Sequence, residues 1–550
     1  MKKTIFWGVC ICFLSLLTAL VIESDHKKKV AEQLDLFQSV FHLLDENYVD
    51  EIDPEKLIRV SIDAMLKSTD PYTAFYNETE TRERNKSWKG ILYAGIGASV
   101  VMRDSNMIIS EPYAGYGAWQ NDLRAGDQLM EVEGKSVKGK KLDEVIKLLR
   151  GEAETSVHIK IKRGDKGLFE KSIIRKEIHV KTVPYFGMID SSVGYIKMDQ
   201  FLENTSMDFK EAFQDLKKKH NCTSLVIDLR SNNGGLVDEA VKILGMFLPE
   251  NTLICTLKGR QSAEAKQYKT HTQPLDTFIP LVILTSEKSI SAAEIFAGCM
   301  QDLDRAVIMG QKTYGKGFVQ GTRFPGYGSS LYVTAARYHT PSGRCVQQLD
   351  YSKLSEGKVF SYADSVKEKF FTKNHRPVYN KGGIEPDTIL KNNLTDEVIQ
   401  SLMQSYFIFD FANAYRNSHA SIASVKTFQL DGKNYNLFIQ SLEKKDYQFE
   451  TRADKHLKEL ERNLSIQASE KDFFQKDFKH FKSDLRSFKK KKILENSGKI
   501  KDLLAQEIIR RYNTVIGVYE YSLLKDQEIR TAAKLLLQMK AYRKILHDDQ

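Results

Sequence analysis

The sequence predicts an α/β protein built from several domains. Segments typical of strands and helices alternate between about residues 193 and 390, which is the pattern of a layered α/β structure. A shorter β-rich segment precedes this region, at residues 90–177, and the chain becomes helical after about residue 392. The length of 550 residues agrees with this division, because it exceeds one ordinary domain.

The composition excludes several broad classes of protein. With 41% apolar and 28% charged residues, the chain can bury real cores and is not disordered by composition. The net charge of +10 is a mild excess without a concentrated basic element, so a nucleic-acid partner is not expected. Six cysteines with no Cys-x-x-Cys pair exclude a disulfide scaffold and indicate no metal site. No cofactor is expected.

Residues 1–29 are predicted to be a signal peptide or a signal-anchor. Lys2 and Lys3 precede an uncharged, mostly apolar run over residues 5–22, which is the arrangement of a secretory signal. The run has about the minimum length for a bilayer span, and no small-x-small cleavage site follows, which favours an uncleaved anchor. A buried soluble helix is the alternative, and the lysines at 27–29 weaken an orientation argument from charge. We therefore expect the rest of the chain to be soluble and exported.

Residues 30–180 are predicted to form a helical region followed by a small β-rich domain. In the helical region, 30–87, apolar residues recur at helix spacing until Asp70-Pro71 interrupts them. In the β-rich domain, 88–180, residues 142–149 have the spacing of an amphipathic helix, and residues 157–161 alternate as a half-buried strand does.

The remaining chain is predicted to hold an α/β core and a helical appendage. The core, 181–390, contains four apolar strand segments separated by helical ones, the strands lying near residues 193–198, 225–227, 281–284 and 306–309. Residues 391–550 contain leucines at helix spacing and a strong helix-forming segment at 531–546, so they are read as a helical domain without an assigned task.

The β-rich domain has features of a peptide-binding module. Gly95, Ile96 and Gly97 precede a strand, and glycines there leave backbone N–H groups free to bind a chain-terminal carboxylate. An extended peptide could then pair with the adjoining sheet edge. The later run Leu123-Arg124-Ala125-Gly126-Asp127, continuing to Lys135, resembles the signature of a PDZ domain. A β domain whose glycines only turn corners is the alternative.

Two segments of the core are candidates for catalysis by a serine and a lysine. Ser291 follows a buried strand at the first turn of a helix, where the helix dipole favours developing negative charge. Lys316 stands between Gly315 and Gly317, and burial could lower its pKa enough for it to act as the base that a serine needs. Gln320 could orient the lysine amine. Each feature alone has an ordinary explanation, since a serine at a helix start is usually a cap and Gly-Lys-Gly an exposed turn.

A third segment is a candidate oxyanion hole. The strand ending at Asp228 is followed by Asn232-Asn233-Gly234-Gly235, whose backbone N–H groups carry little side-chain cover. Gly234 and Gly235 are the predicted donors, with the N–H of Ala292 completing the set. The alternative is an ordinary turn.

Taken together, these segments resemble the carboxy-terminal processing peptidases, or tail-specific proteases. The resemblance covers roughly residues 30–390 and rests on a set of motifs in order: Asp70-Pro71-Tyr72-Thr73, Asp228-Leu229-Arg230 with Asn232 and Gly234-Gly235, Ser289-Ile290-Ser291-Ala292 with Glu294-Ile295, Gly315-Lys316-Gly317 with Gln320, Tyr338 to Arg344, and Gly383-Ile384-Glu385-Pro386-Asp387. Two positions depart from the family pattern, Asn233 where Pro is common and Ala293 where Ser is common. Neither departure removes a proposed catalytic group.

The resemblance implies a fold, a chemistry and a location. The fold is an α/β core akin to crotonase and Clp protease, with an inserted PDZ domain and flanking helical regions. The chemistry is a Ser291–Lys316 dyad assisted by Gln320, without a metal. The partners are protein substrates with apolar C-terminal tails, bound by the PDZ domain and then cut internally. The location is periplasmic, with residues 5–22 as an anchor in the inner membrane, and a homo-oligomer is left open.

Other readings remain open at this point. Lys288 is a rival base, although its polar surroundings favour a charged amine, and His339 is a rival for a histidine mechanism. The chain could also be a catalytically silent PDZ scaffold that holds protein C-termini. A crotonase-like acyl-CoA enzyme is a third possibility, in which the serine would be idle.

Overall fold

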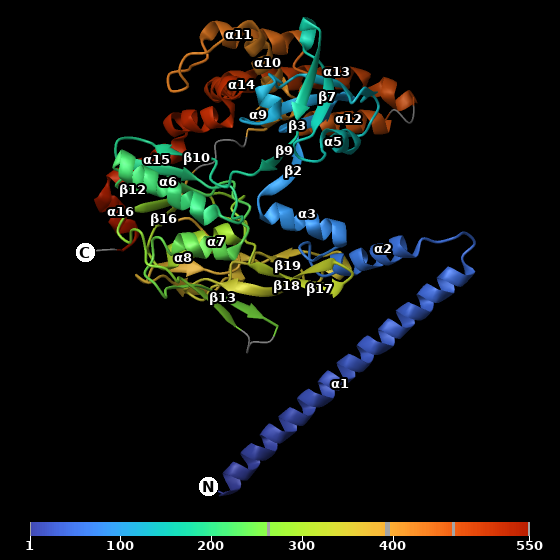
Figure 1. Ribbon diagram of the computed structural model, residues 1–550, viewed down its shortest axis with the longest axis vertical. Coiled ribbons are helices and arrows are strands. Elements are labelled where there is room, and N and C mark those ends of the chain that lie inside the picture. Colours follow the sequence, from blue (N-terminus) through green and yellow to red (C-terminus); the bar gives the residue numbers. More distant parts are fainter. Residues whose placement is uncertain (1, 261–264, 391–395, 465–467, 548–550) are drawn as a thin grey trace.

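The computed structural model describes residues 2–260, 265–390, 396–464 and 468–547 (Figure 1). The chain begins with a long helix that extends away from the remainder of the molecule, α1 (Lys2–Asn47). It continues through α2 (Pro54–Lys67), β1 (Ala74–Tyr76) and α3 (Glu78–Trp88). Asp53 and Asn77 start the latter two helices, because their side chains accept the backbone N–H of Lys56 and Glu80. The helical spacing predicted for this region is therefore confirmed, with one short strand inserted.

The predicted membrane anchor falls where the structure describes no side chains. The backbone of residues 5–22 lies in α1, and their side chains are outside the described part of the chain. Among the helices whose side chains are described, none has the length and apolarity needed to cross a membrane.

A β-rich domain follows and is joined to the rest of the chain by a two-stranded ribbon, β2 (Ile91–Gly95) and β9 (Lys176–His179). Its sheet has the order β3-β4-β5-β7-β8, with β6 paired to β5. The strands are β3 (Ala98–Arg103), β4 (Asn106–Pro112), β5 (Gln128–Val132), β6 (Lys135–Ser136), β7 (Ser156–Lys162) and β8 (Leu168–Ile174). The short helix α4 (Gly117–Gln120) and α5 (Leu142–Leu149) complete it. The strand and the amphipathic helix predicted here are confirmed, because Val145, Leu149, Val157, Ile159 and Ile161 are buried in one cluster.

The central sheet of the core has the order β10-β11-β12-β15-β16-β23. Only the β10–β11 pair is antiparallel. The strands are β10 (Tyr185–Met188), β11 (Val193–Lys197), β12 (Ser224–Asp228), β15 (Leu281–Thr285), β16 (Val307–Gly310) and β23 (Thr388–Ile389). Helices α6 (Thr205–His220), α7 (Val237–Leu244) and α8 (Ala292–Asp302) bury their apolar faces with one side of this sheet. Strands that are buried on both faces need helices on both sides of the sheet. The predicted α/β layering is confirmed, because helices cover this sheet.

A second, antiparallel sheet lies on the other side of α7 and α8 from the first, and α8 contacts strands of both sheets (Figure 1). It has the order β1-β18-β13-β14, and β17 also pairs with β18. These strands are β13 (Leu253–Gly259), β14 (Lys266–Lys269), β17 (Phe318–Gly326) and β18 (Ser329–His339). Short pairs β19 (Leu349–Asp350) with β20 (Phe360–Ser361) and β21 (Lys369–Phe371) with β22 (Pro377–Tyr379) fill the connection back to β23, together with single 3₁₀ turns at Leu354–Glu356 and Asp364–Val366. A further 3₁₀ turn, Gly164–Lys166, joins β7 to β8 in the β-rich domain.

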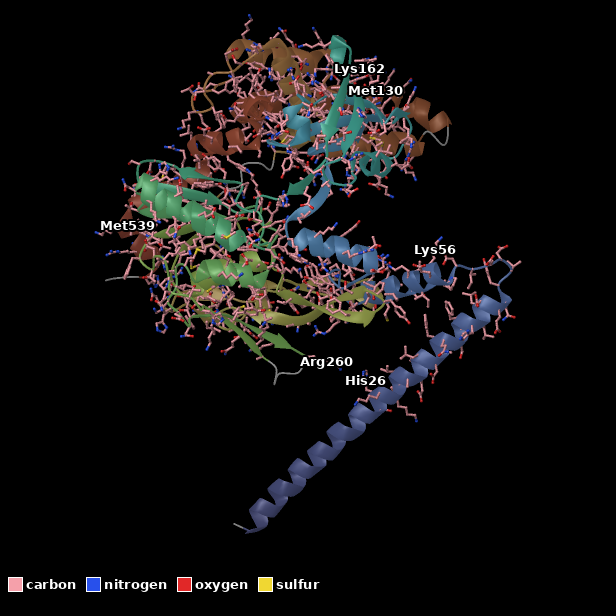
Figure 2. The ribbon with its side chains drawn as sticks, viewed as in Figure 1. His26, Lys56, Met130, Lys162, Arg260 and Met539 are labelled. Atoms are coloured by element: carbon pink, nitrogen blue, oxygen red, sulfur yellow. The ribbon has the colours of Figure 1, made fainter. Side chains whose placement is uncertain are left out.

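The C-terminal region is helical, and its last two helices return to the core. Five helices share a separate apolar cluster beside the β-rich domain: α9 (Glu397–Gln404), α10 (Phe407–Ser418), α11 (Gly432–Lys444), α13 (Ala468–Glu495) and α14 (Ser497–Lys525). The helix α12 (Arg452–Leu464) packs against α13. Arg103 of β3 holds this cluster through a bidentate ion pair with Asp410, at 2.6 and 2.8 Å. The helices α15 (Gln527–Leu537) and α16 (Met539–Ile545) cover the other face of the central sheet. Figure 2 shows the described side chains of all these parts as sticks.

Candidate active site

The loop that joins β15 to α8 ends at Ser291. Ser289 fixes this loop, since its hydroxyl accepts the Ser286 N–H at 3.0 Å and donates to the Leu229 carbonyl at 2.7 Å. Ser291 then takes the first position before α8 with φ 59° and ψ −112°. A positive φ is strained for a residue with a Cβ, and such strain persists only where the surroundings hold it. The predicted nucleophile therefore stands at a sharp, strained turn from strand to helix.

Glu294 joins the two segments that carry the predicted nucleophile and base. Its Oε2 accepts the backbone N–H of Ser291 at 2.9 Å and that of Lys316 at 2.8 Å. Its Oε1 accepts the Thr313 hydroxyl and the Gly315 N–H, both at 2.6 Å. The carboxyl is fully buried, and this burial raises its pKa although the four hydrogen bonds act in the opposite direction. The backbones of Ser291 and Lys316 are thus held by one atom.

Lys316 lies in an environment that weakens its positive charge. Its Nζ stands over the ring of Tyr72, 4.3 Å from the ring centroid. Burial lowers the pKa of the Lys316 amine, and the charges of Glu294 and Asp70 only partly oppose this. A lysine with a lowered pKa can be a general base, because more of it is uncharged at neutral pH.

The turn that contains Tyr72 is built by Asp70. The Asp70 carboxylate accepts the backbone N–H groups of Tyr72 and Thr73, both at 2.8 Å, and the Thr73 hydroxyl at 3.0 Å. The Tyr72 ring meets Phe318 and Tyr351 edge to face. The turn between α2 and β1 thereby contributes one wall of the lysine site.

The glycines of the predicted oxyanion hole lie directly against the nucleophile turn. A Cβ on Gly234, which has φ +87°, would stand 2.5 Å from the Ile290 carbonyl and 3.0 Å from Ser291 Cβ. A Cβ on Gly235 would stand 2.1 Å from the Phe201 carbonyl. Only glycine fits at these positions, which explains the Gly-Gly pair between β12 and α7.

The three predicted donors differ in their present partners. The Gly234 N–H donates to the side-chain oxygen of Asn232 at 2.9 Å. Within the described ranges of the chain, the N–H groups of Gly235 and Ala292 have no acceptor. Asn233 donates its backbone N–H to the Asp199 carbonyl at 3.3 Å. Proline, which is common at this position in the family that the sequence resembles, has no N–H, so asparagine adds a hydrogen bond to the turn.

The other candidate residues lie in settings of different kinds. Gln320 lies in β17 opposite Thr334 of β18 and donates its side-chain amide to the Thr334 hydroxyl at 3.2 Å. Its assistance to Lys316 stays a prediction. Lys288 is exposed. His339 shares a hydrogen bond between its Nδ1 and the Gly343 carbonyl at 2.9 Å, and burial lowers its pKa.

The predicted peptide-binding loop borders a pocket of the β-rich domain. The pocket has a volume of about 180 Å³ and lies between β3 and α5. Its lining comprises Tyr93, Gly95, Ile96, Ala98, Ser99, Val100, Tyr113, Ile146, Leu149 and Arg150. Arg150 stands over the ring of Tyr93, 4.2 Å from its centroid. Gly97 has φ +76°, and a Cβ there would stand 2.2 Å from Tyr116 Cβ, so this loop needs glycine.

In the sequence, Glu294 and Tyr72 are parts of motifs without a predicted task of their own. A signal for Glu294 exists, because a carboxylate interrupts the apolar run of residues 292–300 in a helix that is buried along its whole length. A buried carboxylate must find donors, and the N–H groups of glycine-containing turns are suitable ones. No comparable signal marks Tyr72, since its partners come from segments far along the chain.

Family models match four parts of this chain. These are peptidase family S41 over residues 192–353, a PDZ domain over 108–163, the C-terminal helical domain of a probable PDZ-protease over 398–536, and the N-terminal domain of the activating protease CtpB over 17–81. The order agrees with the domains described above. It confirms the presence of a PDZ domain inserted before the core.

Two relatives by sequence agree with the family models. A probable CtpA-like serine protease of Staphylococcus aureus is 34% identical over 314 residues, covering 57% of this chain but 62% of that protein, which is less than two thirds of its length. A carboxy-terminal-processing protease of Bartonella bacilliformis is 32% identical over 353 residues, 63% of this chain and 80% of that protein. The solved photosystem II D1 C-terminal processing protease matches 66% of this chain and 94% of its own, at 24% identity and a TM-score of 0.35. The chain belongs to the carboxy-terminal-processing proteases of peptidase family S41.

Proposed function

We propose that the protein is a serine endopeptidase that selects protein substrates by their C-terminal tails and cleaves them through an acyl-enzyme on Ser291. The observation that carries this proposal is the shared Glu294 carboxylate, which holds Ser291 and Lys316 side by side at the backbone. The lowered pKa of Lys316 supports its role as the base.

In this mechanism the uncharged Lys316 amine takes the proton of the Ser291 hydroxyl as its oxygen attacks the scissile carbonyl. The carbonyl oxygen becomes an oxyanion, which the Gly235 and Ala292 N–H groups are free to bind. Lys316 then gives its proton to the leaving amine, so the peptide bond breaks and the acyl group stays on Ser291. Water hydrolyses this ester in a second cycle with the same base.

Tail recognition belongs to the PDZ domain in this proposal. The pocket beside Gly95 and Ile96 is lined by aliphatic side chains of β3 and α5, which suit an apolar terminal residue. Arg150 adds a positive charge near the loop that would receive the terminal carboxylate.

We also propose that the substrates are exported proteins and that residues 5–22 anchor the enzyme in the membrane. Fractionation of cells would test this location.

The test is mass spectrometry of the products formed from a substrate with an apolar C-terminal tail. The same substrate with an amidated C-terminus and one with a charged tail serve as matched controls. We expect internal cleavage of the first substrate only, and none with Ser291→Ala or Lys316→Ala. Binding of the tail without cleavage by the unmodified protein would instead favour a silent PDZ scaffold, and full activity of either variant would reject the dyad.

A further inference from the structure

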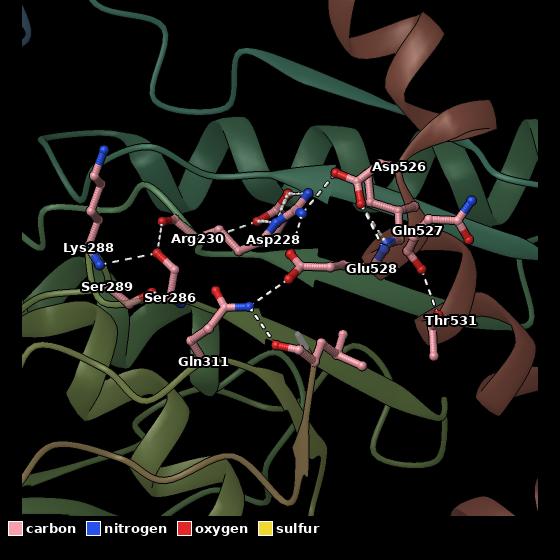
Figure 3. Close-up of polar contacts among 12 residues, drawn as sticks. Asp228, Arg230, Ser286, Lys288, Ser289, Gln311, Asp526, Gln527, Glu528 and Thr531 are labelled. Atoms are coloured by element: carbon pink, nitrogen blue, oxygen red, sulfur yellow. Dashed lines mark hydrogen bonds and ion pairs between the residues drawn. The ribbon is translucent and has the colours of Figure 1, made fainter. Parts of the chain in front are cut away.

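Arg230, in the turn that follows β12, is shared by carboxylates from two distant parts of the chain. Its guanidinium binds Asp228 at 2.7 Å, and its Nη1 binds Asp526 at 2.8 Å and Glu528 at 2.6 Å (Figure 3). Only 19% of the Arg230 side chain is exposed, and 26% and 18% of its two C-terminal partners. Ion pairs with this little solvent are weakly screened. The ionic contact therefore fixes the start of α15 on the end of β12.

The start of α15 is itself rigidly built. Asp526 is the N-cap: its Oδ1 accepts the N–H of Glu528 at 2.8 Å and of Ile529 at 3.1 Å, which leaves Oδ2 for Arg230. Glu528 uses its second oxygen to accept the Gln311 side chain at 2.6 Å, so it also reaches the end of β16 (Figure 3). The helix then packs apolar residues onto β12 and β15, with Val226, Val282 and Leu284 in the same buried cluster.

The residues around Arg230 connect directly to the nucleophile loop. The Arg230 carbonyl accepts the Ser286 hydroxyl, and the Leu229 carbonyl accepts the Ser289 hydroxyl at 2.7 Å. Two residues further, the Asn232 carbonyl accepts the N–H of Ile290 at 2.9 Å. These three bonds join the loop that leads to Gly234 and Gly235 with the loop that ends at Ser291. A shift of Arg230 would therefore reach both loops.

The charges at this place depend on one another. The pKa of Asp228 is held well below its ordinary value, because the charges of Arg230 and Lys197 outweigh the effect of its complete burial. Asp228 also accepts the Tyr195 hydroxyl at 2.7 Å. Removing the negative charge of Asp526 and Glu528 leaves Arg230 with Asp228 alone, and a long side chain with fewer fixed contacts gains freedom.

We propose that Asp526 and Glu528, at the start of α15, are positioning residues for catalysis: through Arg230 they align the oxyanion loop with the nucleophile loop. This rests on the proposed Ser291–Lys316 chemistry. The C-terminal helices are then part of the catalytic scaffold, and the rate of the chemical step depends on a contact made by the last portion of the chain. Asp526 and Glu528 bond to Arg230, Gln311 and the α15 backbone, and neither lines the pocket of the PDZ domain, so we expect substrate binding to be unaffected.

The test compares Asp526→Asn/Glu528→Gln with Asp454→Asn in the full chain. The first variant keeps the shape of both side chains and the cap of α15, and it removes the two negative charges that pair with Arg230. The second removes a matched ion pair, Asp454 with the buried Lys489 at 2.8 Å, inside the C-terminal helices and away from the core. We expect kcat to fall about 10- to 100-fold in the double variant with KM unchanged. Asp454→Asn should lower the thermal midpoint of unfolding about as much as the double variant does, and it should leave kcat unchanged.

A second measurement is independent of activity. Hydrogen exchange at the Asn232 and Ile290 amides, measured in a Ser291→Ala background, should become faster with Asp526→Asn/Glu528→Gln and stay unchanged with Asp454→Asn. Unchanged kcat and unchanged exchange in the double variant would overturn the inference while the dyad stands. An equal loss of kcat in both variants would also overturn it. Failure of the dyad itself would appear differently, as cleavage by Ser291→Ala or Lys316→Ala.

Discussion

The backbone N–H groups of Ser291 and Lys316 donate to the same atom, Oε2 of Glu294, at 2.9 and 2.8 Å. The two residues are 25 positions apart in the chain and belong to different loops, one before α8 and one after β16. A single buried acceptor fixes their separation more firmly than two independent contacts with solvent-exposed groups would. The geometry of the proposed dyad therefore depends on a third residue that takes no proton from the substrate.

Glu294→Gln tests this dependence. An amide can accept with its oxygen, but its NH₂ group would face backbone donors that now meet a carboxylate oxygen. We expect kcat to fall by roughly 100-fold, because small displacements of reacting groups are costly. The free energy of unfolding should fall by about 2 kcal/mol as charged hydrogen bonds are lost. Steady-state kinetics and urea unfolding measure both, and a variant with full kcat would show that the shared carboxylate is not needed.

The strained backbone of Ser291 predicts an unusual order of stabilities. Its φ of 59° with ψ of −112° costs an L-residue energy that glycine avoids. Ser291→Gly should therefore be more stable than Ser291→Ala by about 1 kcal/mol, after the entropy of the added glycine is subtracted. Both variants should be inactive. Urea unfolding of the pair decides the matter, and a glycine variant less stable than alanine would mean that the turn is not strained.

The pH dependence of cleavage follows from the lowered pKa of Lys316. The amine must be uncharged to accept a proton, so kcat/KM should rise with pH through the lysine pKa and level off above it. Because that pKa is lowered, the rise should be complete at a lower pH than for an ordinary lysine. His339→Gln is the control, since it removes the rival base, and a rise that disappears in this variant would assign the limb to histidine.

Tyr72 should influence where this rise occurs. Its ring stands 4.3 Å from Nζ and excludes water from that side. The ring face also attracts a cation, typically by about 0.5–1 kcal/mol at exposed sites. Burial is the larger cause of the lysine shift, so Tyr72→Ala should raise the Lys316 pKa and move the rise to higher pH. Tyr72→Phe keeps the ring and should leave the profile in place; a shift to lower pH in the alanine variant would contradict this account.

The central strands could be predicted because their apolar residues form short, uninterrupted runs. Residues 224–228 and 281–285 are short, continuously buried runs, and such runs fit a parallel sheet covered on both faces. The nucleophile turn was also predictable from local features, since a polar loop precedes an apolar helix at Ser291. These elements depend on neighbours in the sequence, which is why a single sequence suffices.

The long-range contacts could not be predicted in the same way. The apolar face of residues 529–536 indicates a helix that packs on something, and nothing in its spacing says that the cover is the central sheet. Most of the donors to Glu294, from Thr313 to Lys316, and the Tyr72 ring below Lys316 come from remote segments, so they could not be predicted either. Sequence patterns report one element's own period, whereas these contacts depend on how several elements come together.

The central claim is that an uncharged amine at position 316 activates Ser291, and replacing that amine by one of lower basicity tests it most directly. Lys316→Cys treated with bromoethylamine places an amine of similar length beside a sulfur atom, which withdraws electrons and lowers the amine pKa. The protein that retains Lys316, treated with the same reagent, is the control for alkylation of the other thiols. We predict that Lys316→Cys is inactive, that alkylation restores cleavage, and that the rise of kcat/KM then lies at lower pH than in the unmodified protein. Restored cleavage with the rise at its original pH, or full cleavage before alkylation, would contradict the claim.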